Sequence, residues 1–327
     1  MSNLWKQLLA VFGLGIYLPA NLFGINSGEQ ASGQSVPVWN QAVDSIQQTV
    51  EERKLTIPVL KSDGQVHRMD LEDYISRVVL GEMPANFGSE ALKAQAVAAR
   101  TYTLQCIRDG DRHPDGAVCT DYRCCQEYVE PEDYLEAGGT RGSVNKVFRA
   151  VEQTRGEVLR YDGDLIYATY FASSGGSTED AREVWGQAFP YLTVVSSPEP
   201  ESAYDGEQVR FTPSEFLQRL GGELQGNPTD WFGKVTYTAG KGVDLMRIGA
   251  RLYTGVELRR IFGLRSTIFT VTATKDSVTF ETMGYGHRVG LSQYGADAMA
   301  AMGESYDRIL GHYYPGTSLE QYLTDNN

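Results

Sequence analysis

Four residues whose side chains bind soft metal ions lie within one short stretch of this chain. His113, Cys119, Cys124 and Cys125 all fall in the segment RHPDGAVCTDYRCCQEY. Their spacing is not that of a zinc finger, but one imidazole and three thiolates in a loop of this length can close a tetrahedral zinc site. Since all four positions would be protein ligands, we expect a structural ion that does not activate water.

Oxidation of the cysteines is the alternative to metal binding. An exported protein with four cysteines can form two disulfides through three connectivities. A bond between the neighbours Cys124 and Cys125 would be strained, and Cys106 lies within an expected helix, which makes it an awkward partner. The sequence favours zinc, and two disulfides stay open as the competing interpretation.

A carboxylate, Glu82, stands where burial would change its acidity. Asp70 can cap a helix with apolar residues at i, i+3 and i+4 spacing, namely Leu71, Tyr74, Ile75, Val78 and Val79. Glu82 continues that stripe, and Gly81 and Pro84 are expected to end the helix beside it. A carboxyl group that loses hydration has a raised pKa, which suits a general acid near neutral pH. The alternative is that Glu82 turns outward or caps a neighbouring element.

The residues around this helix set further expectations. Glu72 and Asp73 lie a helix length before Glu82, on or near the polar side, so the sequence offers no convincing second carboxylate. Ser89 is expected to cap a second helix, Glu90 to about Cys106, whose many alanines permit close packing. Arg100 on that helix either extends to the surface, the commoner fate, or pairs with a carboxylate.

Composition excludes several classes of protein. The 327 residues are 41% hydrophobic and 22% charged, which fits one large or two ordinary folded domains and rules out wholesale disorder. The net charge of −13 argues against nucleic acid as the main partner, because phosphate binding needs the opposite sign. The 19 tyrosines favour a surface that can stack on flat faces such as sugar rings.

The N-terminal sequence predicts export. Residues 8–25 contain no charged side chain and follow Lys6, which favours a single membrane-spanning anchor in residues 1–25; a cleaved signal peptide is the alternative. Residues 26–53 then read as a flexible linker, rich at first in Ser, Gly, Gln and Asn. From residue 54 to 327 we expect a folded domain.

That domain is expected to be α+β, with mixed, mainly antiparallel sheets and packed helices. Residues 55–60 look like a first strand and residues 165–172 like another. Residues 205–282 carry short segments of both kinds: 216–220, 235–238, a helix 256–262 capped by Thr254, and a hairpin 269–281. Residues 284–295 are expected to form a glycine-rich loop that is no phosphate cradle.

Four motifs, in order, resemble the signature of the stage II sporulation protein D family. The first is LEDYISRVVLGEMPANFGSEALKAQAVAARTYTL, and the second runs from Ser173-Ser174-Gly175-Gly176 through Glu183-Val184-Trp185. The third is GHRVGLSQYGA from Gly286, and the fourth is ILGHYYPGT from Ile309. The resemblance covers about residues 55–320, and the expected membrane segment in residues 1–25 also fits this family.

The resemblance implies a lytic transglycosylase. Such a protein cleaves the β-1,4 bond between N-acetylmuramic acid and N-acetylglucosamine in peptidoglycan strands stripped of stem peptides, during engulfment in sporulation, and leaves a 1,6-anhydro end. Glu82 matches the catalytic acid of the family. The stretch 106–128 resembles the family's zinc loop, with Cys124 where histidine can stand.

The resemblance also implies glycan contacts, which are Ser173, Ser174, Gly175, Gly176, His287, Ser292, Gln293 and Tyr294. A tight turn at the paired glycines and a structural role for His287 are the alternatives, and Arg288 stands where the family has glycine. The implied location is the mother-cell engulfing membrane, by a single pass with the catalytic domain extracytoplasmic. The implied partners are stage II sporulation proteins P, an amidase, and M. The competing functions are a non-catalytic wall-binding enhancer of an amidase and a structural scaffold.

Overall fold

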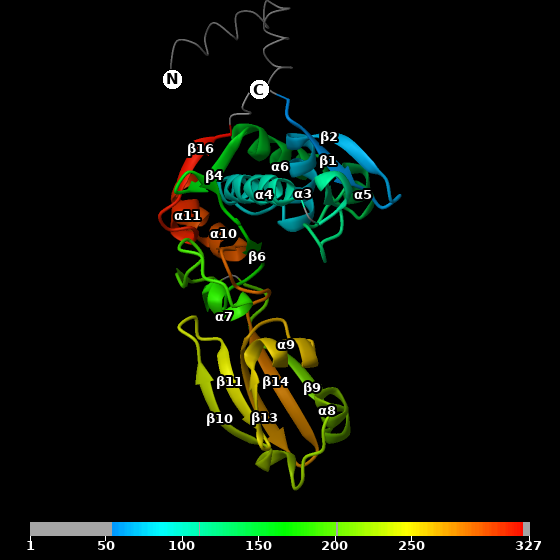
Figure 1. The fold of residues 1–327 in the computed structure, drawn as a ribbon, viewed down its shortest axis with the longest axis vertical. Coiled ribbons are helices and arrows are strands. Elements are labelled where there is room, and N and C mark those ends of the chain that lie inside the picture. Colours follow the sequence, from blue (N-terminus) through cyan, green and yellow to red (C-terminus); the bar gives the residue numbers. More distant parts are fainter. Residues whose placement is uncertain (1–53, 111, 201, 323–327) are drawn as a thin grey trace, which may run out of the picture. The chain divides into compact units, whose positions relative to one another are not determined.

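The computed structural model describes residues 54–322 apart from 111 and 201, and these belong to one unit that begins at Lys54 (Figure 1). The predicted anchor, residues 1–25, and the predicted linker, residues 26–53, lie outside the described residues. No helix in the described part of the chain is both long and apolar enough to cross a bilayer.

Two separate hydrophobic cores divide the described residues into two lobes. The first lobe contains β1 Thr56–Leu60, β2 Val66–Asp70, α3 Leu71–Glu82, α4 Ser89–Asp109, β3 Val118–Cys119, α5 Pro131–Glu136, α6 Arg141–Gln153, β4 Glu157–Tyr161, β5 Asp164–Leu165, β6 Tyr170–Phe171, β7 Gly176–Ser177, α7 Ala181–Trp185, β8 Ser196–Ser197, β15 Leu291–Ser292, α10 Gln293–Ala301, α11 Tyr306–Tyr313 and β16 Ser318–Gln321. The second lobe contains β9 Glu207–Phe211, α8 Pro213–Leu220, β10 Phe232–Tyr237, β11 Val243–Ile248, β12 Arg251–Thr254, α9 Gly255–Phe262, β13 Ile268–Thr274 and β14 Ser277–Met283. Two short 3₁₀ turns, Pro114–Gly116 and Pro228–Asp230, complete the set.

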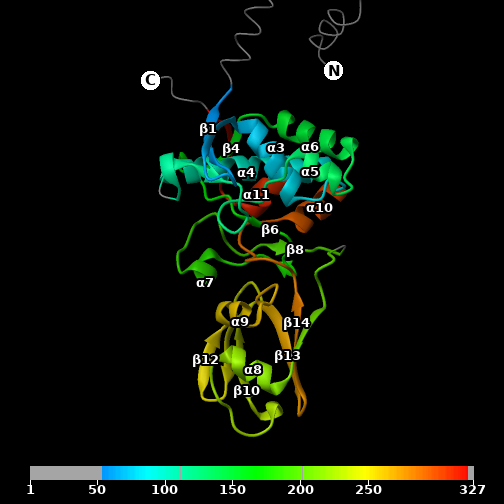
Figure 2. The same cartoon turned by 90° about the vertical axis from the view of Figure 1, so that its right-hand side faces the viewer.

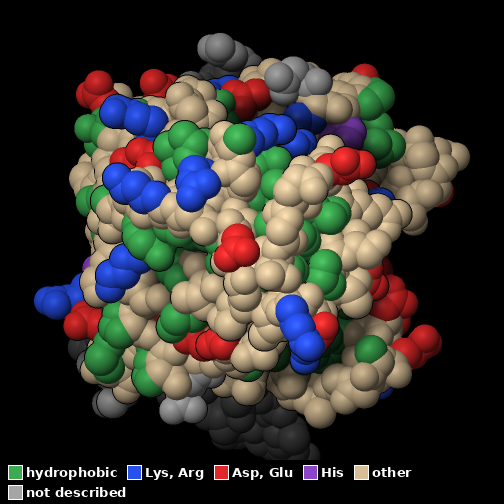
Figure 3. All heavy atoms as spheres, turned by 90° about the horizontal axis from the view of Figure 1, so that it is seen from below, with side chains coloured by type: hydrophobic (Ala, Val, Ile, Leu, Met, Phe, Trp, Pro, Cys, Tyr) green, Lys and Arg blue, Asp and Glu red, His purple; other side chains and the backbone are tan. Residues whose placement is uncertain are grey.

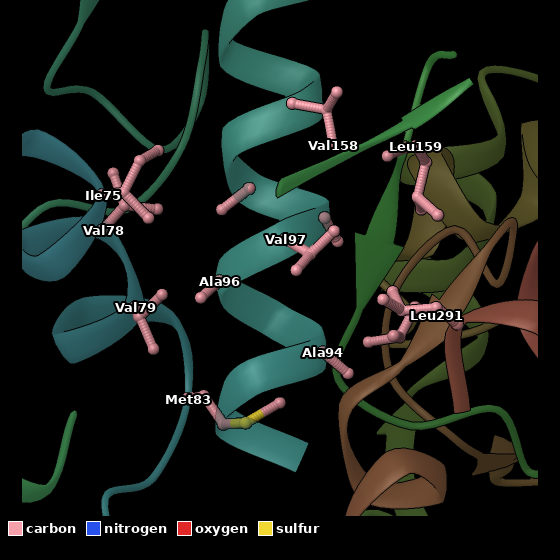
Figure 4. Packing of buried hydrophobic residues seen from close by; sticks show 14 of the residues in the cluster. Ile75, Val78, Val79, Met83, Ala94, Ala96, Val97, Val158, Leu159 and Leu291 are labelled. Atoms are coloured by element: carbon pink, nitrogen blue, oxygen red, sulfur yellow. The ribbon is translucent and has the colours of Figure 1, made fainter. Parts of the chain in front are cut away.

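Helix α4 is the centre of the first lobe, and it contacts α3, α6, α10, α11 and β4. Ala94 and Ala96 are fully buried, and their small side chains let α3 approach one side while β4 and β15 approach the other (Figure 4). The predicted second helix is therefore confirmed, although it is longer than expected and Gly88, not Ser89, is its N-cap.

A buried ion pair on α4 overturns two expectations. Arg100 is fully buried, and its Nη2 atom lies 2.5 Å from Glu72 Oε2 on α3. Neither side chain faces water, because the pair is surrounded by α3, α4 and the backbone of β4, where Glu157 O accepts a hydrogen bond from Arg100 Nη1 at 3.0 Å. Of the two alternatives for Arg100, the surface position was wrong and the pairing with a carboxylate is confirmed; the expectation of Glu72 on or near the polar side was wrong.

Helix α3 forms as its sequence predicts. The Asp70 carboxylate accepts hydrogen bonds from the backbone N–H groups of Glu72 and Asp73, so the predicted cap is confirmed. The helix continues through Gly81 and ends at Glu82. Glycine at position 81 permits close packing, since a Cβ atom there would lie 2.8 Å from the Cγ atom of Glu127.

Most strand pairs are antiparallel, which confirms the predicted mixed α+β class for the described residues. Two pairs are parallel: β1 with β3, and β15 with β6, where Leu291 is opposite Tyr170 and Ser292 opposite Phe171. The predicted strand over 165–172 was wrong, because only its two ends pair as β5 and β6. The parallel pair of β15 with β6 brings residues 291–292 beside residues 170–171, at the wall of the cleft described below.

The second lobe is packed around stacked aromatic rings. Phe216 of α8 and Phe262 of α9 lie 4.8 Å apart between ring centroids. The predicted hairpin is β13–β14 and joins β9, and Thr254 caps α9 as expected. Figure 2 shows the chain entering and leaving this lobe at the end that faces the first lobe.

Figure 3 shows Lys and Arg interspersed with Asp and Glu on the visible face, unlike the basic surfaces of nucleic-acid-binding proteins.

Candidate active site

A cleft of about 790 Å³ opens beside the C-terminal end of α3. Its lining is dominated by aromatic side chains: Tyr102, Tyr122, Tyr134, Tyr170, Phe171, Trp185, Tyr204, Tyr285 and Tyr294. The residues that line it in the described part of the chain include two glutamates, Glu82 and Glu127, and no lysine or arginine. Such a surface can stack on the flat apolar faces of sugar rings.

Glu82 lies in the wall of this cleft and is held by three groups from distant segments. Its Oε1 atom accepts a hydrogen bond of 2.7 Å from the backbone N–H of Glu127 and lies 3.3 Å from the Tyr170 hydroxyl. Its Oε2 atom lies 3.5 Å from the amide Nε2 of Gln293. The carboxyl group is thus oriented by the loop of residues 113–127 that carries the predicted metal ligands (the metal-ligand loop), by β6 and by α10.

Burial raises the pKa of Glu82 above its ordinary value. The backbone N–H of Glu127 acts in the opposite direction, and the negative charge of the Glu127 side chain raises the pKa further. The weaker hydrogen bonds from Gln293 and Tyr170 lower it, but burial prevails. The shift extends the pH range in which Glu82 keeps its proton towards neutral pH, and the protonated state is the one that a general acid needs.

The Tyr170 hydroxyl connects Glu82 to a second chain of hydrogen bonds. It donates to Gln126 Oε1 at 2.8 Å, and the Gln126 amide donates to Thr103 Oγ1 at 2.8 Å. Because a hydroxyl has one proton, the shorter bond to Gln126 leaves only a weak donation from Tyr170 to Glu82 Oε1. Burial raises the pKa of Tyr170 far above its usual range, so this group stays a neutral phenol.

His287 lines the same cleft, as predicted for a groove residue, but it does not act on Glu82. Its Nδ1 atom accepts a hydrogen bond of 3.1 Å from the Val289 N–H, and its ring packs against Phe171 and Trp185. Burial and the nearby Arg259 charge lower the pKa of His287 to about 4. The imidazole is therefore neutral at pH 7, so it forms part of the cleft wall without adding a charge to it.

The other predicted glycan contacts divide into two groups. Gln293 and Tyr294 line the cleft, but Ser173, Ser174, Gly175, Gly176 and Ser292 do not. All three of these serines are buried and donate hydrogen bonds to one carboxylate, Glu199. Gly175 and Gly176 both have positive φ angles, which fits the tight turn considered as the alternative.

Arg288, where the family resemblance expects glycine, keeps the backbone conformation that glycine favours. Its φ angle is +68°, and its side chain is fully buried. The guanidinium compensates for this strain with hydrogen bonds of 2.9 Å to the carbonyl groups of Ser174 and Ser177 and an ion pair of 3.5 Å with Glu179. The loop path is therefore held by contacts that a glycine could not make.

The predicted metal ligands converge. One ligand atom from each of His113, Cys119, Cys124 and Cys125 lies within 4.8 Å of the other three. All four cysteines of the chain are free, and the backbone N–H of Cys119 points at the Cys125 sulfur at 3.3 Å. Three sulfurs and an imidazole at such separations fit a tetrahedral zinc ion, whose bonds are about 2.0–2.3 Å long.

The metal-ligand loop is part of the cleft. Cys124 and Cys125 line it and are followed directly by Gln126, which binds Tyr170, and by Glu127, which binds Glu82. Sequence reasoning missed Gln126, Glu127 and Tyr170 as members of the site. The only sequence signal for Gln126 and Glu127 was that they directly follow the last cysteine. The expectation of no second carboxylate near Glu82 was wrong, because the fold places Glu127 of that loop beside Glu82.

Comparison with known proteins finds one family and several relatives. Residues 61–161 match the family model described as "Stage II sporulation protein". The chain is 34% identical over 302 residues to stage II sporulation protein D of Bacillus subtilis (strain 168), covering 90% of this chain and 88% of that protein. The protein of the same name from Bacillus amyloliquefaciens is 36% identical over 280 residues, covering 84% and 81%. The amidase enhancer of Bacillus subtilis (strain 168) is 32% identical over 300 residues, covering 75% of this chain and 40% of that protein.

Proposed function

Because this chain belongs to the stage II sporulation protein D family, we propose that it is a sporulation lytic transglycosylase that cleaves peptide-denuded peptidoglycan strands during engulfment. The observation that carries the proposal is Glu82, a carboxyl group with a raised pKa in the wall of an aromatic cleft. The bond to be cleaved is the β-1,4 link between N-acetylmuramic acid and N-acetylglucosamine.

The proposed reaction needs one protein carboxyl group. Protonated Glu82 gives its proton to the glycosidic oxygen as the bond from that oxygen to C1 of the muramic acid breaks. The C6 hydroxyl of the same sugar attacks C1, and its proton returns to Glu82. The products are a free 4-hydroxyl and a 1,6-anhydro ring, so no water is consumed and no second carboxylate must act as nucleophile or base, as in ordinary glycosidases.

We further propose that His113, Cys119, Cys124 and Cys125 hold a structural zinc ion. The convergence of their ligand atoms within 4.8 Å supports this. A zinc ion with four protein ligands has no open position, so it would stabilise the loop and supply no activated water. Through that loop it would hold the Glu127 N–H against Glu82.

The direct test uses purified glycan strands with and without stem peptides. We expect residues 45–327 to release fragments with 1,6-anhydro-muramyl ends from denuded strands, as measured by mass spectrometry. A product with the mass of a water-hydrolysed strand would contradict the transglycosylase reaction while leaving Glu82 as a glycosidase acid. Absence of any new fragment would contradict an enzymatic role.

The pH dependence of the rate is a second expected result. Since Glu82 must be protonated, kcat/KM should fall as the pH rises through its raised pKa. The Glu127 side chain contributes to that raised value by charge repulsion, so Glu127→Gln should move the alkaline limb to lower pH. The measurement is the pH profile of both proteins on denuded glycan, and an alkaline limb that Glu127→Gln leaves in place would contradict the assignment.

The second candidate function is non-catalytic enhancement of an amidase. It is favoured by the 32% identical relative that carries the name amidase enhancer. An enhancer would bind glycan in the same aromatic cleft and would raise the rate of an added amidase without making 1,6-anhydro ends. The variant Glu82→Gln separates the two, because an enhancer would keep its effect.

Placement and partners complete the proposal. We propose that residues 1–25 anchor the protein in the mother-cell engulfing membrane, with the catalytic domain outside the cytoplasm. A substrate without stem peptides requires an amidase that acts first, and the proposed partner is stage II sporulation protein P, with stage II sporulation protein M as a membrane organiser. The family membership and the relative named as an amidase enhancer support a link to wall amidases.

A further inference from the structure

We infer that Glu199 is a positioning residue for the proposed reaction: it fixes the two chain segments that bring Tyr170 and Gln293 to Glu82. The inference rests on the proposed function of Glu82. Glu199 lies outside all four sequence motifs and does not line the cleft.

The Glu199 carboxylate is buried and accepts hydrogen bonds on both oxygens. Ser173 Oγ and the backbone N–H of Ser174 donate to Oε2 at 2.6 and 2.9 Å. Ser197 Oγ and Ser292 Oγ donate to Oε1 at 2.9 and 2.6 Å. Carboxylate oxygens accept hydrogen bonds, and each of these four groups can donate one, so the groups around Glu199 are all of the kind that a carboxylate binds.

Three of the four motifs meet at this carboxylate. Ser173 and Ser174 belong to the second motif and Ser292 to the third, and Tyr313 of the fourth reaches it through a 2.6 Å contact with Ser197 Oγ. The glycine at position 295 is also explained, since a Cβ atom there would collide with the Tyr313 hydroxyl and Ser197 Oγ. The contacts of these motif residues thus depend on a residue that no motif contains.

The anchored segments are the ones that carry the partners of Glu82. Ser173 follows β6, which contains Tyr170, by two residues, and Ser292 directly precedes Gln293. The Ser292 hydroxyl donates a hydrogen bond to Glu199 and accepts one of 3.3 Å from the Gly295 N–H, so it caps α10 at the turn that presents Gln293. Tyr294 N–H then donates to Ala172 O at 3.0 Å, which closes the connection between the two segments.

Loss of the carboxylate should therefore loosen both groups that orient Glu82 from this side of the cleft. A misplacement of about 1 Å at a reacting group can reduce a rate by about 100-fold, even when the altered residue is remote. Substrate binding should change less than the rate, because most aromatic residues of the cleft, Trp185 and Tyr122 among them, lie outside the two anchored segments.

The test compares Glu199→Gln with Glu72→Gln in the same protein. Glu72 is a matched control because it is also a buried carboxylate, and it is bonded to Arg100 and the Gly156 N–H, none of which lines the cleft. We expect Glu199→Gln to lower kcat on denuded glycan by about 10- to 100-fold with KM changed by less than about threefold. Glu72→Gln should lower Tm but leave kcat per folded molecule unchanged. Equal kcat in the two variants, or a loss confined to KM, would overturn the inference.

Hydrogen exchange gives a readout that does not depend on activity. In Glu199→Gln the amides of Leu291 and Tyr294 should exchange faster, since both donate across to the segment 169–172. If the wild-type protein makes no product, the proposed function fails, and unchanged exchange at these amides would separately overturn the positioning role. Should Glu199→Gln not fold, Ser292→Ala removes one of the four donors and should show the same pattern with a smaller loss of kcat.

Discussion

Replacing Glu82 by glutamine is expected to reduce formation of 1,6-anhydro product by about 10²–10⁴-fold, the usual cost of removing a general acid. Glutamine has nearly the same shape and can still accept the Glu127 N–H, which lies 2.7 Å from Oε1 in the wild-type protein. It cannot give a proton to the glycosidic oxygen. The measurement is the initial rate on denuded strands, with product identified by mass.

The same substitution should not destabilise the protein at neutral pH. A carboxyl group whose pKa is raised on folding binds its proton more tightly in the folded state, so its favourable contribution exists at low pH and is lost as pH rises through that raised pKa. Above that pKa, the ionised Glu82 carboxylate is buried at a cost that a neutral glutamine side chain avoids. The Tm of Glu82→Gln should therefore equal or exceed that of the wild type at neutral pH, and the difference should shrink in acid.

Glu130→Gln is a suitable control for the rate measurement. Glu130 pairs with Arg77 at 2.6 Å and with Lys61 at 3.2 Å, and it does not line the cleft. Its loss should leave the rate unchanged. A Glu82→Gln protein that turned over at nearly the wild-type rate would show that another group supplies the proton, and Glu82 would lose its proposed role.

Removal of the proposed zinc ion is expected to cause the largest loss of stability. Structural zinc supplies on the order of 10 kcal/mol in zinc-dependent peptides, and a domain of 150–250 residues loses about 2–4 °C of Tm per kcal/mol, so we expect Tm to fall by at least ~10 °C. Chelation or Cys125→Ser should have this effect. Elemental analysis of the untreated protein should find one zinc per chain.

Cys106→Ser is the matched control for the zinc prediction. Cys106 is a free, buried cysteine on α4 that does not belong to the four-residue cluster. Its replacement should leave the zinc content at one per chain and cost far less stability. A protein with no metal and no titratable thiols after denaturation would contradict the zinc site and support two disulfides.

Local sequence patterns predicted those elements of the fold that are stabilised by interactions between residues close together in the chain. The Asp70 and Thr254 caps, the α3 stripe and the β13–β14 hairpin each follow from residues a few positions apart. The burial of Arg100 did not, because its partner Glu72 lies 28 residues away and comes within reach only when α3 packs on α4. The sequence predicts that α4 is a helix, but it does not show that α3 packs against it.

The candidate site shows the same division. Glu82 could be selected because its own helix places it at the end of a buried stripe. Tyr170 and Glu127, which orient and polarise it, come from residues 88 and 45 positions away along the chain. The serines were recognised as a motif, but their common acceptor, Glu199, was invisible until the fold brought three motifs together.

The chain enters and leaves the second lobe at one place. Gly206 N–H donates to Thr282 O at 2.9 Å, Gly284 N–H donates to Asp205 Oδ1 at 2.9 Å, and the rings of Tyr204 and Tyr285 lie 5.0 Å apart just before and after it. Because the two ends of the second lobe lie next to each other, the first lobe needs no long loop to accommodate it. Evolution can therefore enlarge, exchange or shorten residues 205–284 as a module, provided that the two tyrosines at its base, which line the cleft, keep their places.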